Sequence, residues 1–317
     1  MGLPAAAADP RSTRTAPGLA IALLSGLSFG LAGPFAASLL ATGWSPLAVA
    51  LARLAGTAVL LAVPLAVVVA RGWRPRPGHL RAVAVYGVVP LAGAQVCYFG
   101  AVERLSVGVA LLIEYTAPVL LLGWIWARTA ARPRPATLLG AALAVVGLVL
   151  VLDVARGAAV DVVGVAWGLA AAVCLAAYFQ LSAAAGHGDD DEGGPTAIVL
   201  VAGGTVVGSA VVVLVGLVGL LPLTATSAAI DLGGWSAPWW VGAALVAGVS
   251  TTLAYLTGIA AVGRLGSQLA SFVGLSEVLF AVLGAWWLVA QRPAPTQVAG
   301  GVLIVAAVAL IRWAEPG

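Results

Sequence analysis

Long apolar stretches alternate along the chain with short polar or Gly/Pro-rich connections. Each stretch is roughly 20 residues long, which as a helix spans the hydrocarbon core of a bilayer, about 30 Å. The runs are unbroken, unlike the short alternating strands of an outer-membrane barrel. The pattern predicts an all-α integral membrane protein with ten transmembrane helices, at approximately 18–40, 46–69, 81–102, 106–127, 136–153, 161–183, 196–222, 237–261, 266–290 and 294–313.

Composition supports this class, because 62% of the residues are hydrophobic and only 9% are charged. Soluble domains carry about 25% charged residues. The net charge of +3 comes from Arg residues in short loops, where basic residues orient helices, so we expect no nucleic-acid partner. Arg residues predicted on one side outnumber those on the other, and this bias predicts that both termini are cytoplasmic: Arg11, Arg14, Arg71, Arg74, Arg76, Arg81, Arg128, Arg132, Arg134, Arg264 and Arg312 against Arg104, Arg156 and Arg292.

No motif points to a cofactor, a metal ion or an enzyme. Cys97 and Cys174 lie within apolar stretches and form no CxxC or Cys/His cluster, so neither a metal site nor a disulfide is indicated. Metalloprotease, nucleophile-elbow, ATP-binding and dinucleotide-binding signatures are all missing. The acidic loop 189–192 is interpreted as a solvated linker, with a cation or regulatory site as the alternative.

The second half of the chain repeats the first at an offset of 160 residues. This offset aligns Arg104 with Arg264, Trp126 with Trp286, Gly140 with Gly300, and Arg132-Pro133-x-Pro135 with Arg292-Pro293-x-Pro295. The repeat predicts a cytoplasmic tail at 1–16 and two five-helix halves at 17–160 and 161–317. Since five crossings per half place the second half upside down, we expect inverted repeats, as in alternating-access carriers with a site near the midplane between halves.

Two carboxylates and one guanidinium lie deep in predicted helices. Glu114 stands in LSVGVALLIEYTAPVLLLGWIW and Glu277 in GSQLASFVGLSEVLFAVLGAWW. A charge at such depth costs roughly 2.5–3.5 kcal/mol, so it needs a partner, a cavity or a task. A carboxyl group in a low-dielectric cavity can carry a proton near neutral pH, which proton coupling requires. Arg53 has the depth of Glu114 and can either pair with it or extend to the interface.

Proline and small residues predict how the helices bend and pack. Pro118 has no N–H to bond the carbonyl of Glu114, so it should interrupt that helix. With Pro34, Pro64 and Pro90 it predicts a first half that is more bent than the second. The GxxxG pair Gly26 and Gly30 predicts close helix packing.

Other polar side chains within the stretches can line a cavity: Gln95, Tyr98, Tyr115, Tyr178 and Tyr255. Gln95 and Tyr98 are three residues apart and share one helix face. The alternative for each of these residues is a hydrogen bond that joins neighbouring helices.

The segments GVALLIEYTAPVLLLGW at 108–124 and SEVLFAVLGAWWLVAQRPAPTQVAGGVLI at 276–304 resemble the EamA type of the drug/metabolite transporter superfamily, nearest to the threonine/homoserine exporter branch. Val278 replaces the proline usual after that glutamate, and Gln291-Arg292 stands where a Gly-Glu pair is common. The resemblance implies export of amino acids or related small metabolites across a bacterial plasma membrane by proton exchange. Alternatives are export of lipophilic cations, a polytopic scaffold, and action as a single chain or a homodimer.

Overall fold

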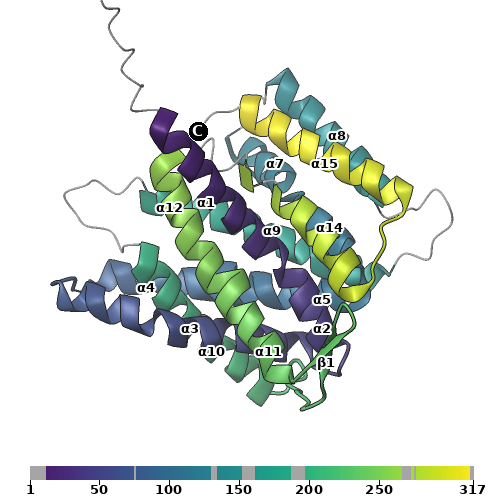
Figure 1. Ribbon diagram of the computed structural model, residues 1–317. Coiled ribbons are helices and arrows are strands. Elements are labelled where there is room, and N and C mark those ends of the chain that lie inside the picture. Colours follow the sequence, from purple (N-terminus) through teal and green to yellow (C-terminus); the bar gives the residue numbers. More distant parts are fainter. Residues whose placement is uncertain are drawn as a thin grey trace, which may run out of the picture.

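The computed structural model describes residues 12–74, 76–129, 134–151, 161–186, 197–265, 273–274 and 276–314 (Figure 1). Each of the ten predicted stretches contains helix. The helices are α1 (Ser12–Gly30), α2 (Ala32–Leu40), α3 (Pro46–Ala70), α4 (Pro77–Tyr86), η1 (Gly87–Gly93), α5 (Ala94–Arg104), α6 (Val107–Glu114), α7 (Ala117–Thr129), α8 (Pro135–Val151), α9 (Val162–Gly186), α10 (Ala197–Leu217), α11 (Trp239–Ala244), η3 (Leu245–Leu253), α12 (Ala254–Leu265), α14 (Ser276–Val289) and α15 (Pro295–Ala314). Most of the predicted tail 1–16, the boundary at 160 and the acidic loop 189–192 lie outside the described residues.

Five described segments are long and apolar enough to cross a membrane: Pro17–Leu40, Pro46–Ala70, Pro77–Arg104, Ile198–Leu217 and Trp239–Gly258. Shorter apolar helices at Pro135–Val151, Val162–Tyr178, Ser276–Val289 and Pro295–Leu310 accompany them. The protein is therefore a multi-pass membrane protein, whereas the full set of ten crossings stays a prediction.

Helix interruptions follow the prolines of the first half in three of four places. The first predicted helix breaks at Leu31, the third is π-helical around Pro90, and the fourth breaks at Tyr115 and Thr116, just before Pro118. The exception among these four prolines is Pro64, through which α3 continues unbroken. A proline that lacks an N–H frees one carbonyl, and the chain relieves this by a break or a wider turn.

The second half is interrupted as well, at a segment that contains no proline, so prolines do not account for every interruption; the greater bend of the first half stays a prediction. The π-helical segment η3 separates α11 from α12. Hydroxyl groups stabilise its wider turn, since Thr251 Oγ1 donates to Val246 O at 2.9 Å and Thr252 Oγ1 donates to Ala247 O at 2.9 Å. The sequence did not predict this segment, although the run of three hydroxyl residues at 250–252 could have indicated it.

A short antiparallel hairpin corrects the all-α prediction. Strands β1 (Ile230–Leu232) and β2 (Trp235–Ala237) are joined by Gly233 and Gly234, whose φ values of 65° and 88° suit a tight hairpin turn. The backbone N–H of Gly233 donates to Leu288 O at 2.8 Å, which attaches the hairpin to the end of α14. The preceding helix α10 also ends earlier than predicted, at Leu217 rather than 222.

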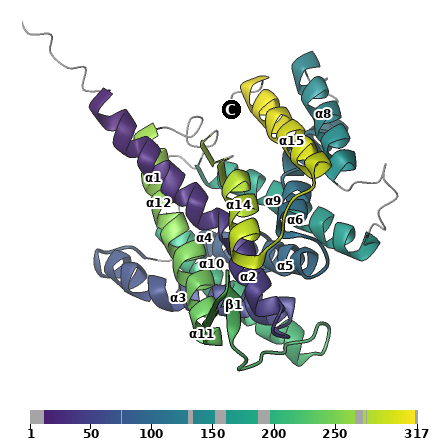
Figure 2. The same cartoon turned by 45° about the vertical axis from the view of Figure 1, so that its right-hand side comes forward.

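Four pairs of helices, each with one member from either half, pack along each other. α1 lies along α12 and α9 lies along α5, while α3 pairs with α10 and α8 pairs with α15 (Figures 1 and 2). α1 and α9 are the first helices of the two halves, and α12 and α5 belong to the third helices. The pair α1 and α12 therefore corresponds to the pair α9 and α5, as two related halves would produce. The core between them is filled by fully buried side chains such as Leu39, Phe99 and Ile113.

The predicted close packing at Gly26 and Gly30 is confirmed, because these glycines set α1 against the start of α14. A methyl group on Gly30 would lie 2.7 Å from Glu277 O and 2.9 Å from Ala281 N. A methyl group on Gly26 would lie 2.6 Å from Ser276 Oγ. Neighbours formed by backbone cannot rotate away, so only glycine permits this approach of the two helices.

We expect Gly30→Val to destabilise the protein by about 1–3 kcal/mol, the usual cost of forcing extra atoms into a packed interface. Gly123→Val is the matched control, because a methyl group on Gly123 would meet nothing within 4 Å. The measurement is the thermal unfolding midpoint of both variants in the same detergent. Equal midpoints would show that α1 and α14 separate without cost.

Candidate functional site

Polar side chains from both halves gather in the interior between the helices. The cluster consists of Arg53 on α3, Tyr98 on α5, Glu114 and Tyr115 at the end of α6, Tyr255 on α12 and Glu277 in α14. Electrostatic interactions link Arg53 with Glu277, Glu114, Tyr98 and Tyr255, and link Glu114 with Glu277. The structure therefore brings together six of the eight residues singled out in the sequence.

The break after α6 positions the first carboxylate and its neighbour. Tyr115 N still bonds Leu111 O at 2.9 Å, and the Thr116 hydroxyl donates to Ile113 O at 2.7 Å. The helix resumes at Ala117, with Pro118 in its first turn. Glu114 and Tyr115 are half-buried, so this break presents two polar side chains at one depth.

A hydrogen bond joins the two halves at the cluster. The Tyr115 hydroxyl donates to Glu277 Oε2 at 2.8 Å, although the two residues are 162 positions apart in the chain. Glu277 is half-buried and lies in the first turn of α14, whereas the sequence placed it near the middle of a longer helix. Residues 266–272 of that predicted helix lie outside the described part of the chain.

Arg53 is buried, with 4% of its surface exposed, so its predicted extension to the interface is wrong. Its Nη2 donates to Ser250 O in η3 at 3.2 Å, and its guanidinium carbon lies 5.8 Å from the centre of the Phe99 ring. One turn later on α3, Thr57 donates to Ala247 O at 3.2 Å. Two side chains of α3 thus bind carbonyl groups of the π-helical segment.

Among the described residues, no ion pair joins Arg53 to Glu114. The ion pair found in this part of the chain connects Arg104 with Asp161. Arg53 instead interacts with both carboxylates over a longer distance. Its Nε has no hydrogen-bond partner in the described part of the chain. One edge of the guanidinium is therefore available to a bound molecule.

Tyrosine residues surround these charges. The Tyr98 hydroxyl faces Gly33 of α2, and Tyr255 meets the Phe29 ring edge-on at a centroid distance of 5.0 Å. Tyr178 on α9 lies 5.9 Å from the Tyr86 ring and interacts electrostatically with Tyr255. Tyr178 thus extends the cluster on the side of α9.

Gln95, the eighth predicted residue, lies on α5 one turn before Tyr98. Its Oε1 is buried and, within the described residues, has no hydrogen-bond partner. Ser276 Oγ, beside Glu277, is likewise buried and has no hydrogen-bond partner among the described residues. Buried polar atoms are normally paired, so these atoms point to water or a ligand.

Two contacts in the structure were missed in the sequence. The thiols of Cys97 on α5 and Cys174 on α9 form a hydrogen-bonded pair close to Glu114. Asp161 caps α9 by accepting from Gly164 N at 2.8 Å and pairs with Arg104 at 3.5 Å. The Gly164 N–H, followed by Arg104, lowers the pKa of Asp161. An Asp before an apolar run is an N-cap signal that could have indicated this contact.

The cluster can bind a molecule with charges of both signs. Carboxylates suit an ammonium group, a guanidinium suits a carboxylate, and tyrosine rings enclose the apolar remainder. Within the described residues, no three His, Cys, Asp or Glu side chains are grouped so that they could hold a metal ion.

Comparisons with known proteins agree with this architecture. The model of the EamA-like transporter family matches residues 16–153, so an EamA domain of the drug/metabolite transporter superfamily is detected in the first half. A solved structure titled "Crystal structure of protein" shares the fold, with a TM-score of 0.55 and 23% identity over 96% of this chain and 98% of that chain. No curated protein matches the chain. The threonine/homoserine exporter branch stays a prediction.

Proposed function

Because an EamA domain indicates a membrane transporter of small molecules, we propose that the protein is a secondary transporter that exports amino acids or related small metabolites by proton exchange. It acts in a bacterial plasma membrane with both termini in the cytoplasm, rather than as an enzyme. A single chain contains both halves of the site, so a homodimer is not required for transport.

The observation that carries this proposal is the cluster of opposite charges between the halves. Arg53 is buried, its Nε has no hydrogen-bond partner among the described residues, and Glu277 faces it from the other half. An amino acid would place its carboxylate at Arg53 and its ammonium group at Glu277. These interactions with the charges of the site offset the cost of removing the charges of the substrate from water.

Alternating access is supported by the bond between Tyr115 and Glu277. This bond crosses from one half to the other, so a rocking motion that separates the halves must break it. A substrate ammonium group at Glu277 can replace the phenol as the donor. Substrate binding would then release one of the contacts that join the halves in the present arrangement.

Glu114 is the proposed proton carrier. It lies close to Glu277 and Arg53, and it is half-buried at the end of the interrupted helix α6. Protonation of Glu114 when the site faces one side and release on the other would couple each cycle to the proton gradient.

A second candidate substrate class is a lipophilic cation, which the tyrosine rings and two carboxylates would also suit. Arg53 argues against it, because a buried guanidinium repels a cation that carries no carboxylate. A polytopic scaffold would have no use for this cluster. Competition between amino acids and quaternary ammonium dyes for transport separates the two substrate classes.

The test is proton movement in proteoliposomes after addition of pooled amino acids. Wild type should give a signal, and Glu114→Gln should reduce it at least about tenfold, the effect of losing roughly 1.4 kcal/mol of coupling. Glu103→Gln is the matched control, because Glu103 is exposed at the end of α5 and lies outside the cluster. A wild-type signal in Glu114→Gln would make Glu114 structural, and absence of any amino-acid signal would favour the cation alternative.

A further inference from the structure

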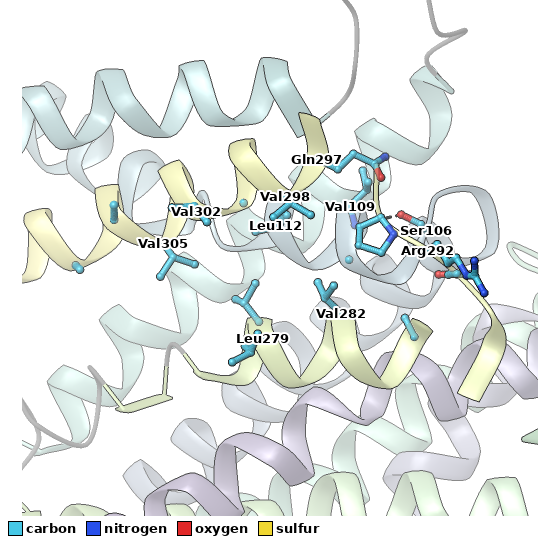
Figure 3. Close-up of a pocket in the computed structure, with 18 residues that line it drawn as sticks. Ser106, Val109, Leu112, Leu279, Val282, Arg292, Gln297, Val298, Val302 and Val305 are labelled. Carbon is cyan, nitrogen blue, oxygen red and sulfur yellow. Dashed lines mark hydrogen bonds between the residues drawn. The ribbon is translucent and has the colours of Figure 1, made fainter. Parts of the chain in front are cut away.

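An apolar groove of about 450 Å³ lies between α6, α14 and α15, beside the polar cluster rather than on it (Figure 3). The consecutive helices α14 and α15 are not packed along each other, since α15 lies against α8 and α14 against α1, α2 and α6. The groove occupies the space that this arrangement leaves. Its floor includes Leu112 and Val278, each within two residues of a cluster carboxylate.

Polarity changes along the groove. Figure 3 shows Ser106, Arg292 and Gln297 at one end, and Val302, Val305 and Leu279 toward the other. Arg292 is exposed and is the one charged residue among the described residues that line the groove. The ion pair of the described residues involves Arg104 and Asp161, so Arg292 is not neutralised in this part of the chain.

Hydrogen bonds hold the polar end of the groove in place. Gln291 Oε1 accepts from Val107 N at 2.9 Å, which ties the connection before α15 to the start of α6. Gln297 Oε1 accepts from Ala294 N at 3.0 Å and caps α15. These bonds fix Arg292 at the mouth of the groove, where the N-terminus of α15 adds positive potential.

The length of the groove matches one leaflet of a bilayer. Its lining positions on α15 run from Gln297 to Ala309, an advance of about 18 Å along the helix. Half of a hydrocarbon core is about 15 Å. A channel with that length, an apolar wall and a cationic end fits a single acyl chain with a phosphate above it.

We propose that this groove binds an anionic glycerophospholipid, with one acyl chain between α14 and α15 and the phosphate at Arg292. The exposed apolar residues along its rim, Leu279 at 58%, Val298 at 50% and Val302 at 64%, contact that chain. Because the wall includes the turn of α14 that follows Glu277, the lipid supports the helix that carries this carboxylate. This inference does not depend on which substrate is transported.

The test is lipid retention measured by native mass spectrometry, with phosphatidylglycerol and phosphatidylcholine of identical acyl chains. Wild type should retain one phosphatidylglycerol per chain with about fivefold preference, the effect expected of one basic residue near an anionic lipid. Arg292→Gln should lose the preference, whereas the matched control Arg264→Gln should keep it. Arg264 is exposed and donates to the carbonyl of Ala260 in its own helix.

A groove-filling variant tests the acyl chain separately. Val302→Trp, and Ala306→Phe as a second variant, should lose both lipids, whereas Val59→Trp on the exposed face of α3 should retain them. Equal retention of both lipids by wild type, a preference that survives Arg292→Gln, or lipid retained by both filled variants would overturn the proposal. A dimer that these variants dissociate, or displacement of the lipid by transported substrate, would assign the groove to another occupant and overturn it as well.

Discussion

Glu277→Gln is expected to abolish every mode of substrate movement, whereas Glu114→Gln should abolish only movement driven by a pH gradient. Glu277 is the carboxylate that receives a bond from the opposite half and would receive the substrate ammonium group in its place. A hydrogen bond to a charged group contributes about 1.5–3 kcal/mol, so its loss corresponds to a reduction of roughly 10–150-fold. Exchange of labelled for unlabelled substrate requires no net proton transfer, so a proton carrier can be lost without stopping it.

The measurement is exchange of radiolabelled amino acid across proteoliposomes without a pH gradient, beside uptake driven by a gradient. Tyr115→Phe is the matched control for the bond, because it removes the phenol donor and keeps the Glu277 carboxylate. It should retain exchange more fully than Glu277→Gln. Exchange at the wild-type rate in Glu277→Gln would exclude the proposed contact with substrate.

The carboxylates and the break beside Glu114 could be predicted because the membrane makes their costs large. A charge in an apolar run and a proline four residues after it both leave unpaired groups that lipid cannot satisfy. Both predictions depend on a residue and its immediate neighbours in the sequence, so they needed no knowledge of the fold. The same reasoning predicted an interruption at each of four prolines in the first half; three interruptions are present, and the prediction failed at Pro64, where α3 continues unbroken.

Contacts between distant segments could not be predicted in the same way. The sequence left open whether Arg53 pairs with Glu114 or extends to the interface, because depth along a helix says nothing of the face on which a side chain lies. Its burial follows from a carbonyl of η3, 197 positions away, and the π-helical turn there was not predicted. The bond from Tyr115 to Glu277 likewise depends on how α6 meets α14, which neither local sequence specifies.

Arg53→Leu is expected to destabilise the protein by about 3–5 kcal/mol, the usual cost of leaving buried charges without their partner. Arg53 is 4% exposed, and its guanidinium bonds Ser250 O and interacts with both Glu114 and Glu277. Leucine removes the positive charge and leaves the carboxylates facing each other. The free energy of unfolding, measured by titration with sodium dodecyl sulfate, should therefore fall further than in Arg264→Leu, where the guanidinium is exposed.

The double variants decide whether this loss comes from charge or from packing. If Arg53 acts by offsetting the carboxylates, adding Glu114→Gln or Glu277→Gln to Arg53→Leu should restore part of the stability, because a neutral amide no longer needs a cation. The interaction free energy of each cycle then separates the two carboxylates. Glu277 already receives the Tyr115 hydroxyl, whereas no described residue donates a hydrogen bond to the Glu114 side chain. We therefore expect the larger recovery with Glu114→Gln. Additive effects in both cycles would mean that Arg53 stabilises the fold through Ser250 and its packing on Phe99 alone.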